Sequence, residues 1–333
     1  MEVSKIKVIV STPARLHFGI VDMRGDLGRI HGSIGVAINE PRLIISATRS
    51  PTLKVTGSRS NRVLEFAKII LDDAGISEGV NFHVIKDIPE HSGFGSGTQL
   101  ALAVGSSISR LFDLNLSVTN LTMKLSRSKV SGIGTQTFQH GGFIVDGGHR
   151  MDKLNSVPPL VFHSDIPLNW RFIIGVPKIN QAISGEIEKK AFKAFEPPSQ
   201  EIVGEVARIV LMKMIPSIIE KDIIEFGESM TDLDFKFGEY WMKVQGGRFS
   251  HPLIEAGVNH LLKSGSYGAG QSSWGPAFYG LADGEKHARK ITESLNEFLN
   301  SQGRQGTAFF TKADNRGAIF QEKKDNDGNG EMR

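Results

Sequence analysis

The chain of 333 residues is longer than a single hydrophobic core usually serves, so we expect two domains. Its 39 lysines and arginines against 36 aspartates and glutamates give a net charge of +3, which is too small an excess to indicate nucleic-acid binding. The absence of cysteine excludes disulfides, thiolate nucleophiles and cysteine-ligated zinc or iron–sulfur sites.

The N-terminal half is rich in predicted strands. It opens without a signal-peptide core, and no stretch approaches the roughly 18 apolar residues of a membrane span, so we expect a soluble cytoplasmic protein with no membrane contact. Branched residues predict strands at 6–10, 36–50, 52–57 and 81–89. Four glycines within 25–35 indicate a loop. Helices are predicted over 61–75, 98–111 and 121–128, and the glycine-dense segment 131–148 ends in a strand.

The C-terminal half is rich in predicted helices. Three prolines within 157–170 place the domain boundary there, which gives domains over 1–165 and 166–322. Two amphipathic stretches, 199–225 and 226–242, are interpreted as core helices, and further helices are predicted at 251–264 and 284–300. The polar segment 323–333 is predicted to be a disordered tail. Strands followed by helices indicate an α+β protein rather than a regular doubly wound sheet.

The stretch HSGFGSGTQL, residues 91–100, lies between a predicted strand and a predicted helix. Gly93, Gly95 and Gly97 permit a close backbone approach and positive φ angles. Backbone N–H groups and the dipole at a helix start favour an anion, and Ser96 and Thr98 are able to cap the helix or donate to phosphate oxygens. We therefore predict a phosphate site here; the alternative is a glycine-rich connection with a capped helix and no ligand.

Neither of the two best-known phosphate signatures fits this stretch. A P-loop requires a lysine after its final glycine, where Thr98 and Gln99 stand. A dinucleotide fingerprint requires its third glycine at position 98, where this chain has Thr98.

Two further stretches add candidate residues. SYGAGQSSWGP, residues 266–276, is a second glycine–serine turn that leads into a predicted strand. TPARLHFGIVD, residues 12–22, places Arg15, His17 and Asp22 among apolar residues. Alternation along a strand would point Arg15 and His17 to the same face. Buried charges need partners, so this cluster is either a salt-bridged structural feature or part of a site.

Together these stretches resemble the GHMP kinase superfamily. Its central motif, P-x-x-x-G-L-G-S-S-A, is matched from Pro89 to Gly97, and its C-terminal glycine–serine loop is matched from Gly268 to Gly275. The order and spacing of the motifs fit along nearly the whole chain. The resemblance implies a two-domain α+β fold, with an N-terminal domain like ribosomal protein S5 domain 2 and a ferredoxin-like C-terminal domain.

The chain departs from the superfamily at one position. Many members carry S-G-x-D before a glycine pair, and that aspartate is taken as the base that activates the acceptor hydroxyl. Here Ser131, Gly132 and Ile133 are followed by Gly134, although the later pair Gly141–Gly142 is kept. A glycine cannot accept a proton, which puts ordinary phosphoryl transfer in doubt.

One branch of the superfamily is not known for kinase chemistry. The strings TPARLHFGIVDMRGDLGRIHGSIG, SGIGTQTFQHGGFIVDGG and GQSSWGPAFYG are similar to the β-ribofuranosylaminobenzene 5′-phosphate synthase family. This resemblance implies that phosphoribosyl pyrophosphate is joined to 4-aminobenzoate, with release of pyrophosphate and carbon dioxide, in methanopterin biosynthesis. It also suggests a homodimer, and the chemistry asks for Mg²⁺ as cofactor, with ligands that the sequence leaves unknown.

The candidate residues follow from these matches. Arg15 and His17 are assigned to the substrate carboxylate or 5′-phosphate, and Asp22 with Asp26 to magnesium or a ribose hydroxyl, unless the two aspartates only form turns. Trp274 either stacks on the aromatic substrate or is a core or interface tryptophan. The predicted phosphate- and substrate-binding residues are Gly93, Gly95, Ser96, Gly97, Thr98, Gln99, Gly268, Gly270, Gln271, Ser272 and Ser273.

Two other functions stay open at this point. One is a small-molecule kinase of the same superfamily that uses ATP and a different base. The other is a module that binds a phosphate or nucleotide without turning it over. The missing carboxylate favours the synthase and the binding module over the kinase, and the long family-specific strings favour the synthase.

Overall fold

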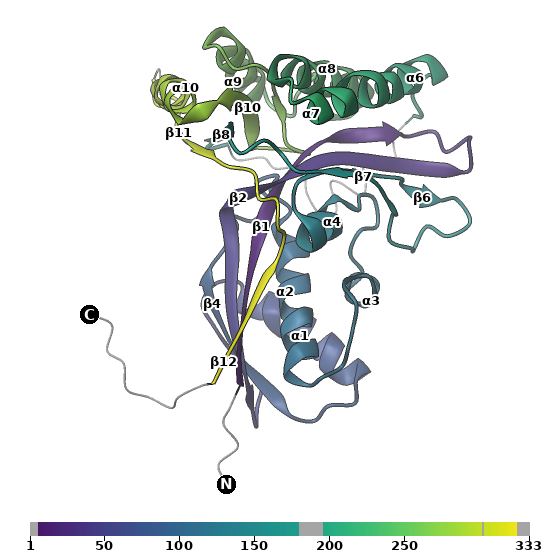
Figure 1. Ribbon diagram of the computed structural model, residues 1–333, viewed down its shortest axis with the longest axis vertical. Coiled ribbons are helices and arrows are strands. Elements are labelled where there is room, and N and C mark those ends of the chain that lie inside the picture. The colour runs from purple at the N-terminus through teal and green to yellow at the C-terminus, as the bar shows by residue number, and fades with distance from the viewer. Residues whose placement is uncertain (1–5, 180–195, 302, 325–333) are drawn as a thin grey trace.

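The computed structural model describes residues 6–179, 196–301 and 303–324, and these form two antiparallel-rich sheets with helices packed against them (Figure 1). The strands of the first sheet are β1 (Ile6–Asp22), β2 (Arg29–Ser50), β3 (Lys54–Thr56), β4 (Gly79–Lys86), β5 (Phe143–Asp146), β6 (His149–Arg150), β7 (Leu160–Ser164) and β12 (Ile319–Lys324). Its main path runs β12-β1-β2-β4-β3, while β5 and β6 pair with β2 and β7 pairs with β5.

The long hairpin of β1 and β2 corrects the predicted loop at 25–35. The two strands pair from Lys7 opposite Thr48 to Asp22 opposite His31, so the turn between them is confined to residues 23–28. The glycines beyond the turn continue β2 because that strand is paired on both sides, with β1 and with β5. Gly35 brings β2 close to the Leu16 carbonyl of β1, where a side chain would collide.

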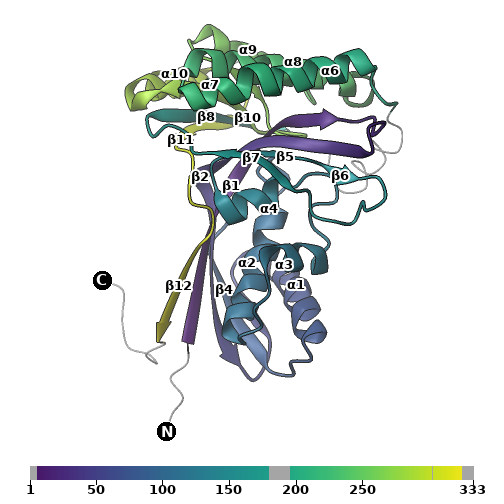
Figure 2. The same cartoon turned by 45° about the vertical axis from the view of Figure 1, so that its right-hand side comes forward.

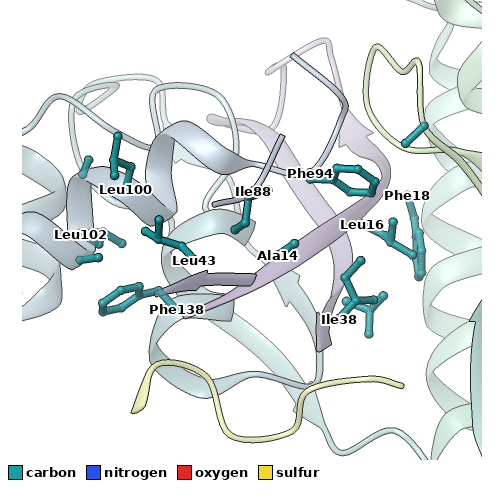
Figure 3. Packing of buried hydrophobic residues seen from close by; sticks show 14 of the residues in the cluster. Ala14, Leu16, Phe18, Ile38, Leu43, Ile88, Phe94, Leu100, Leu102 and Phe138 are labelled. Carbon is teal, nitrogen blue, oxygen red and sulfur yellow. The ribbon is translucent and has the colours of Figure 1, made fainter. Parts of the chain in front are cut away.

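Four helices belong to the N-terminal half: α1 (Ser60–Asp73), α2 (Ser96–Leu111), α3 (Val118–Lys124) and α4 (Ile133–His140). α2 packs against β1 and β2, with α1 beside it (Figures 1 and 2). The apolar side chains of α2 face the sheet and are buried, and Leu100, Val104 and Ile108 are fully inaccessible. Phe94, in the loop before α2, joins the same core as Leu16 and Phe18 of β1 (Figure 3). The loop is therefore fixed to the sheet by its own aromatic side chain.

The second sheet has the order β11-β8-β10-β9 and is covered by helices that form one layer of the molecule (Figures 1 and 2). Its strands are β8 (Trp170–Pro177), β9 (Ala269–Gln271), β10 (Phe278–Asp283) and β11 (Gly306–Thr311). The helices are α6 (Gln200–Ile209), the π-helix η1 (Val210–Met214), α7 (Ile215–Glu220), α8 (Ile223–Gln245), α9 (Pro252–Lys263) and α10 (Gly284–Leu299). α9 and α10 bury their apolar faces on this sheet, and α8 packs against β9 and β1.

The two halves are joined by more than one connection. β7 belongs to the first sheet and β8 to the second, so the chain passes between them within the proline-rich segment 157–170. After β11 the chain returns, and β12 pairs with β1 from Ser11 opposite Ile319 to Ile6 opposite Lys324. The start of the predicted tail, residues 323–324, thus ends β12, and 325–333 lie outside the described residues.

Candidate active site

The first glycine turn forms the predicted strand-to-helix anion site. Gly93 and Gly95 have φ angles of +82° and +73°, and α2 begins at Ser96. Thr98 N–H donates to the Gly95 carbonyl at 3.2 Å, whereas the helix offers no acceptor to the N–H groups of Ser96 and Gly97. The turn therefore presents backbone donors at a helix start, as a bound phosphate requires.

Arg15 lies directly against this turn. Its guanidinium donates from Nη1 to the Gly93 carbonyl, and its backbone N–H donates to the Phe94 carbonyl at 3.1 Å. A Cβ atom at Gly95 would stand 3.0 Å from Arg15 Cγ and 3.1 Å from Nε. Only glycine lets the guanidinium approach the backbone so closely, which concentrates positive charge at the predicted phosphate position.

His17 is buried next to Arg15 on the same strand. Its side chain is 5% exposed, and Nδ1 has no hydrogen-bond partner among the described residues. Burial, together with the charge of Arg15, lowers the pKa of His17 from 6.5 to about 3. His17 is consequently neutral near pH 7 and contributes a polar ring rather than a second cation.

The second glycine–serine stretch, predicted as a turn, contains a strand, because Ala269–Gln271 form β9 beside β10; its turn begins at Ser272 and contacts the first glycine turn. Ser272 Oγ donates to the Gly93 carbonyl at 2.7 Å and accepts from His17 N–H at 3.0 Å. Ser273 N–H donates to the His17 carbonyl at 3.2 Å. A Cβ atom at Gly93 would stand 2.5 Å from the Ser272 carbonyl oxygen. Gly93 thus accepts hydrogen bonds from both halves of the molecule.

Two glutamines that were predicted to bind a ligand form hydrogen bonds with other residues of the protein. Gln99 is fully buried; its amide donates to the Gly134 carbonyl at 2.8 Å, and its Oε1 accepts from Thr12. Gln271 Oε1 accepts from Ser250 N–H and Oγ, both at 2.9 Å. These contacts join α2 to α4 and fix the second turn, so contact of either amide with substrate stays a prediction.

The remaining residues of the second turn pack against the helical layer. Gly268 of this turn lies on the backbone of Gly227 in α8, and Gly270 lies between the Tyr279 hydroxyl and Asp234. Asp234 accepts from Gln271 N–H at 3.1 Å, and burial raises its pKa well above the usual range. The glycines are needed here for close packing under the turn.

Trp274 lies against another tryptophan. Its ring centroid is 4.6 Å from that of Trp241, in an edge-to-face arrangement. This contact favours the interpretation of Trp274 as a packing residue between the second turn and α8.

The two aspartates of the N-terminal cluster organise the turn of the β1–β2 hairpin. Asp22 Oδ1 accepts from Arg24 N–H at 2.6 Å and from Gly25 N–H at 3.0 Å. Asp26 forms an exposed ion pair with Arg24 at 2.7 Å. Their contacts match the turn-forming alternative. Among the described residues, no group of three or more histidines or carboxylates is arranged to hold a metal ion.

Gly134, which stands where the motif S-G-x-D of the sequence resemblance has its aspartate, lies beside the first turn. It is the second residue of α4, and a Cβ atom there would stand 3.0 Å from Thr98 Cγ2. A carboxylate at this position would therefore lie next to the predicted phosphate. The neighbouring Asp146 does not replace it, because its oxygens accept from Gly132 N–H and Gly148 N–H, both at 2.9 Å.

Sequence reasoning missed Arg127, which follows α3. Its Nε and Nη2 each lie 3.4 Å from Thr98 Oγ1, and a Cβ atom at Gly97 would stand 3.3 Å from Nη2. An arginine in the polar run SRSK carries no spacing signal, so only the fold brings it to the glycine turn.

Reasoning from single residues also missed a pair of histidines. His31 Nδ1 and His149 Nδ1 lie 3.4 Å apart, and His149 Nε2 donates to the Ser128 carbonyl at 2.8 Å. The two residues are far apart in sequence, and only the pairing of β2 with β6 brings them together.

Two surface cavities lie away from all of these residues. One, of about 580 Å³, is bounded by α6, η1 and α8; the other, of about 1120 Å³, lies near the C-terminal end of α2. Neither is lined by a predicted site residue. The candidate site is defined by the contacts between the two glycine turns. No helix in the described part of the chain combines the length and apolar character needed to cross a bilayer.

Comparison with known proteins finds a family model for each half of the molecule. Residues 61–142 match the GHMP kinases N terminal domain, and residues 214–301 match the GHMP kinases C terminal domain. Among solved structures, a homoserine kinase from Cytophaga hutchinsonii superimposes with a TM-score of 0.70 at 16% identity, over 96% of this chain and 98% of the other. That likeness concerns the fold.

Two archaeal relatives match over almost their whole length. The β-ribofuranosylphenol 5′-phosphate synthase of Methanothermobacter thermautotrophicus is 32% identical over 95% of this chain and 99% of its own. The protein of the same name from Methanocaldococcus jannaschii is 32% identical over 93% of this chain and 99% of its own. The chain therefore belongs to the GHMP kinase superfamily and, within it, to the enzyme family of the β-ribofuranosylphenol 5′-phosphate synthases.

Proposed function

We propose that the protein transfers the phosphoribosyl group of phosphoribosyl pyrophosphate to a 4-substituted benzoate, releasing pyrophosphate and carbon dioxide. The bond from the anomeric carbon to the diphosphate breaks, and the ring carbon that carries the carboxylate forms the new carbon–carbon bond. The bond to the carboxylate then breaks, and its electron pair restores the aromatic ring.

The observation that carries this proposal is Gly134 beside Thr98. A kinase of this superfamily would use a carboxylate at this place to take the proton of the acceptor hydroxyl, and glycine has no proton acceptor. The proposed reaction does not need that base, because the substituent para to the carboxylate supplies electron density to the attacking carbon.

The first glycine turn would hold the leaving group. As the diphosphate departs, negative charge gathers on its oxygens, and the N–H groups of Ser96 and Gly97 with the Arg15 guanidinium would stabilise that charge. The turn is fixed before substrate binds, since Arg15 and Ser272 both donate to the Gly93 carbonyl. A prearranged site avoids the cost of ordering its donors during the reaction.

Mg²⁺ is part of this proposal. A metal carried mainly by the phosphate oxygens of the substrate fits a site that offers backbone donors and arginines. When bound, the ion would neutralise charge on the departing diphosphate. We also propose a homodimer, which sedimentation would test.

The para substituent of the aromatic substrate is open to direct measurement. The notion of an aminobenzene product follows from the resemblance of the three sequence strings, whereas the relatives are named for a phenol product. By the same decarboxylating chemistry, a phenol product corresponds to 4-hydroxybenzoate and an aminobenzene product to 4-aminobenzoate. Both acids therefore belong in the test.

The experiment mixes purified protein, Mg²⁺ and phosphoribosyl pyrophosphate with either acid, labelled in its carboxyl group. We expect labelled carbon dioxide and a ribosylated phenol or aniline from at least one acid. A parallel reaction replaces phosphoribosyl pyrophosphate with ATP and a set of small alcohols. Formation of ADP there, with no carbon dioxide from either acid, would show a kinase and refute the proposal.

A further inference from the structure

We propose that Arg127 is a second guanidinium of the diphosphate site and binds the leaving group at Gly97 and Thr98, as Arg15 does at Gly95. The inference rests on the proposed function in one respect: the ligand is taken to be the diphosphate of the sugar substrate. It adds a binding residue that neither the glycine motif nor the N-terminal cluster contains.

The guanidinium of Arg127 lies close to two residues of the turn, Thr98 and Gly97. Its Nε and Nη2 both face Thr98 Oγ1, at 3.4 Å each. The same Nη2 lies 3.3 Å from the point where a side chain would begin at Gly97. The guanidinium therefore lies over the first turn of α2, within reach of an anion bound there.

The contacts with Thr98 are long enough to be exchanged for a ligand. Hydrogen bonds from nitrogen to oxygen are usually 2.7–3.2 Å long and weaken beyond that range. A phosphate oxygen accepts charge-assisted bonds from a guanidinium that are shorter and roughly twice as strong as bonds to a neutral hydroxyl. Exchanging the Thr98 hydroxyl for a phosphate oxygen would thus replace a long hydrogen bond by a shorter and stronger one.

The backbone around Arg127 is fixed on both sides. Its own N–H donates to the Thr122 carbonyl at 2.8 Å, at the end of α3. The next residue, Ser128, bonds through its hydroxyl to Thr135 in α4 at 2.7 Å, and its carbonyl accepts from His149 Nε2 at 2.8 Å. The arginine is therefore held in place by α3, α4 and β6, as a preorganised binding residue should be.

Gly134 lies close to the same threonine that Arg127 contacts. Thr98 contacts Gly134 through its methyl group and Arg127 through its hydroxyl. An aspartate at position 134 would lie on the other side of Thr98 and would attract the guanidinium. With glycine there, position 134 places no carboxylate beside Thr98.

The test is calorimetric titration of inorganic pyrophosphate with Mg²⁺ into wild type and Arg127→Gln. Loss of a hydrogen-bonded charge contact should weaken binding roughly 10- to 100-fold. Arg127→Lys keeps the charge but not the two-pronged geometry and should lie between them. Lys129→Gln removes one charge from an exposed position of the same loop and should bind within about twofold of wild type.

Each outcome decides the inference. Equal affinity of wild type and Arg127→Gln, or an equal loss in Lys129→Gln, would overturn it, as would a wild-type protein that binds no pyrophosphate. If Arg127→Gln has a lowered melting temperature, the pyrophosphate affinity of Arg127→Lys is compared with that of wild type instead. If pyrophosphate binds through Arg127 and neither benzoate releases carbon dioxide, the inference stands while the proposed reaction fails.

Discussion

At the scale of single residues, the site depends on a few atoms that gather around one carbonyl group. The Gly93 carbonyl accepts from the Arg15 guanidinium and from Ser272 Oγ. Because the guanidinium has further N–H donors, it is able to hold the turn and contact a phosphate at the same time. Arg15 therefore combines a structural contact with a proposed binding contact.

Arg15→Ala should raise the KM for phosphoribosyl pyrophosphate roughly 10- to 100-fold, since it removes a charged hydrogen-bonding partner of the ligand. Arg15→Lys keeps the charge and should recover part of the loss. Steady-state kinetics with both variants make the measurement. Unchanged affinity for both substrates in Arg15→Ala would remove this residue from the site.

Gly134→Asp tests how the absence of a carboxylate beside Thr98 affects binding of the diphosphate. A carboxylate there would repel the bound diphosphate, so we expect a KM for phosphoribosyl pyrophosphate about tenfold or more above that of Gly134→Ala. The alanine variant controls for the added Cβ atom, which stands 3.0 Å from Thr98 Cγ2 in both variants. Gain of ATP-dependent phosphorylation by the aspartate variant, without loss of sugar-phosphate binding, would argue against the proposed chemistry.

At the scale of elements, two glycine turns from distant parts of the sequence form one contact. Both turns have a clear pattern of glycines next to hydroxyl residues, although Ala269–Gln271 of the second predicted turn form strand β9. The helix α4 was not expected within the glycine-dense segment, and the loop expected at 25–35 is largely strand. In both places, tertiary packing and strand pairing outweigh the local preference of glycine.

Gly93→Ala should lower the melting temperature more than Gly28→Ala does. The two glycines have matching φ angles, +82° and +83°, so in each variant a left-handed alanine destabilises the folded state by about 1–2 kcal/mol. Only Gly93 faces an obstacle, the Ser272 carbonyl at 2.5 Å, whereas Gly28 has nothing within 4 Å. Thermal unfolding followed by circular dichroism would measure the difference.

The expected extra loss for Gly93→Ala is about 2 °C or more. Equal melting temperatures for the two variants would show that the contact between the turns does not constrain the backbone at Gly93.

At the scale of the whole molecule, the fold class and the order of motifs could be predicted, but the long-range contacts between residues could not. Arg127 contacts Thr98, and His31 contacts His149, only because the fold brings the segment after α3 to α2 and pairs β2 with β6. The return of β12 to β1 is likewise a long-range pairing, which a polar C-terminal sequence does not signal. Local pattern carries no information on contacts of this kind.

The stability of the whole protein should fall as the pH is lowered from 6.5 to 4. Burial lowers the pKa of His17 to about 3 and that of His31 to about 4, so the unfolded chain binds their protons first and is favoured by acid. Asp146 opposes this trend, because burial raises its pKa to about 6 and the folded protein binds that proton first. Asp234 opposes it as well, because burial raises its pKa, whereas His140, His149 and His260 also have lowered pKa values and add to the fall. Five histidines against two carboxyl groups leave a net loss of stability.

Melting temperatures across this pH range provide the measurement. His31→Gln should make the fall shallower, and Asp146→Asn should make it steeper, since each removes one of the opposing groups. A melting temperature that is constant or rises on acidification would contradict the assignment of the buried histidines as neutral.

The central claim is that the first glycine turn binds the departing diphosphate between two arginines. Its most direct test is a crystal structure with Mg²⁺ and pyrophosphate. The account predicts the diphosphate on the N–H groups of Ser96 and Gly97, within hydrogen-bonding distance of Arg15 and Arg127. A diphosphate bound elsewhere, or a turn occupied by side chains in the presence of saturating ligand, would contradict it.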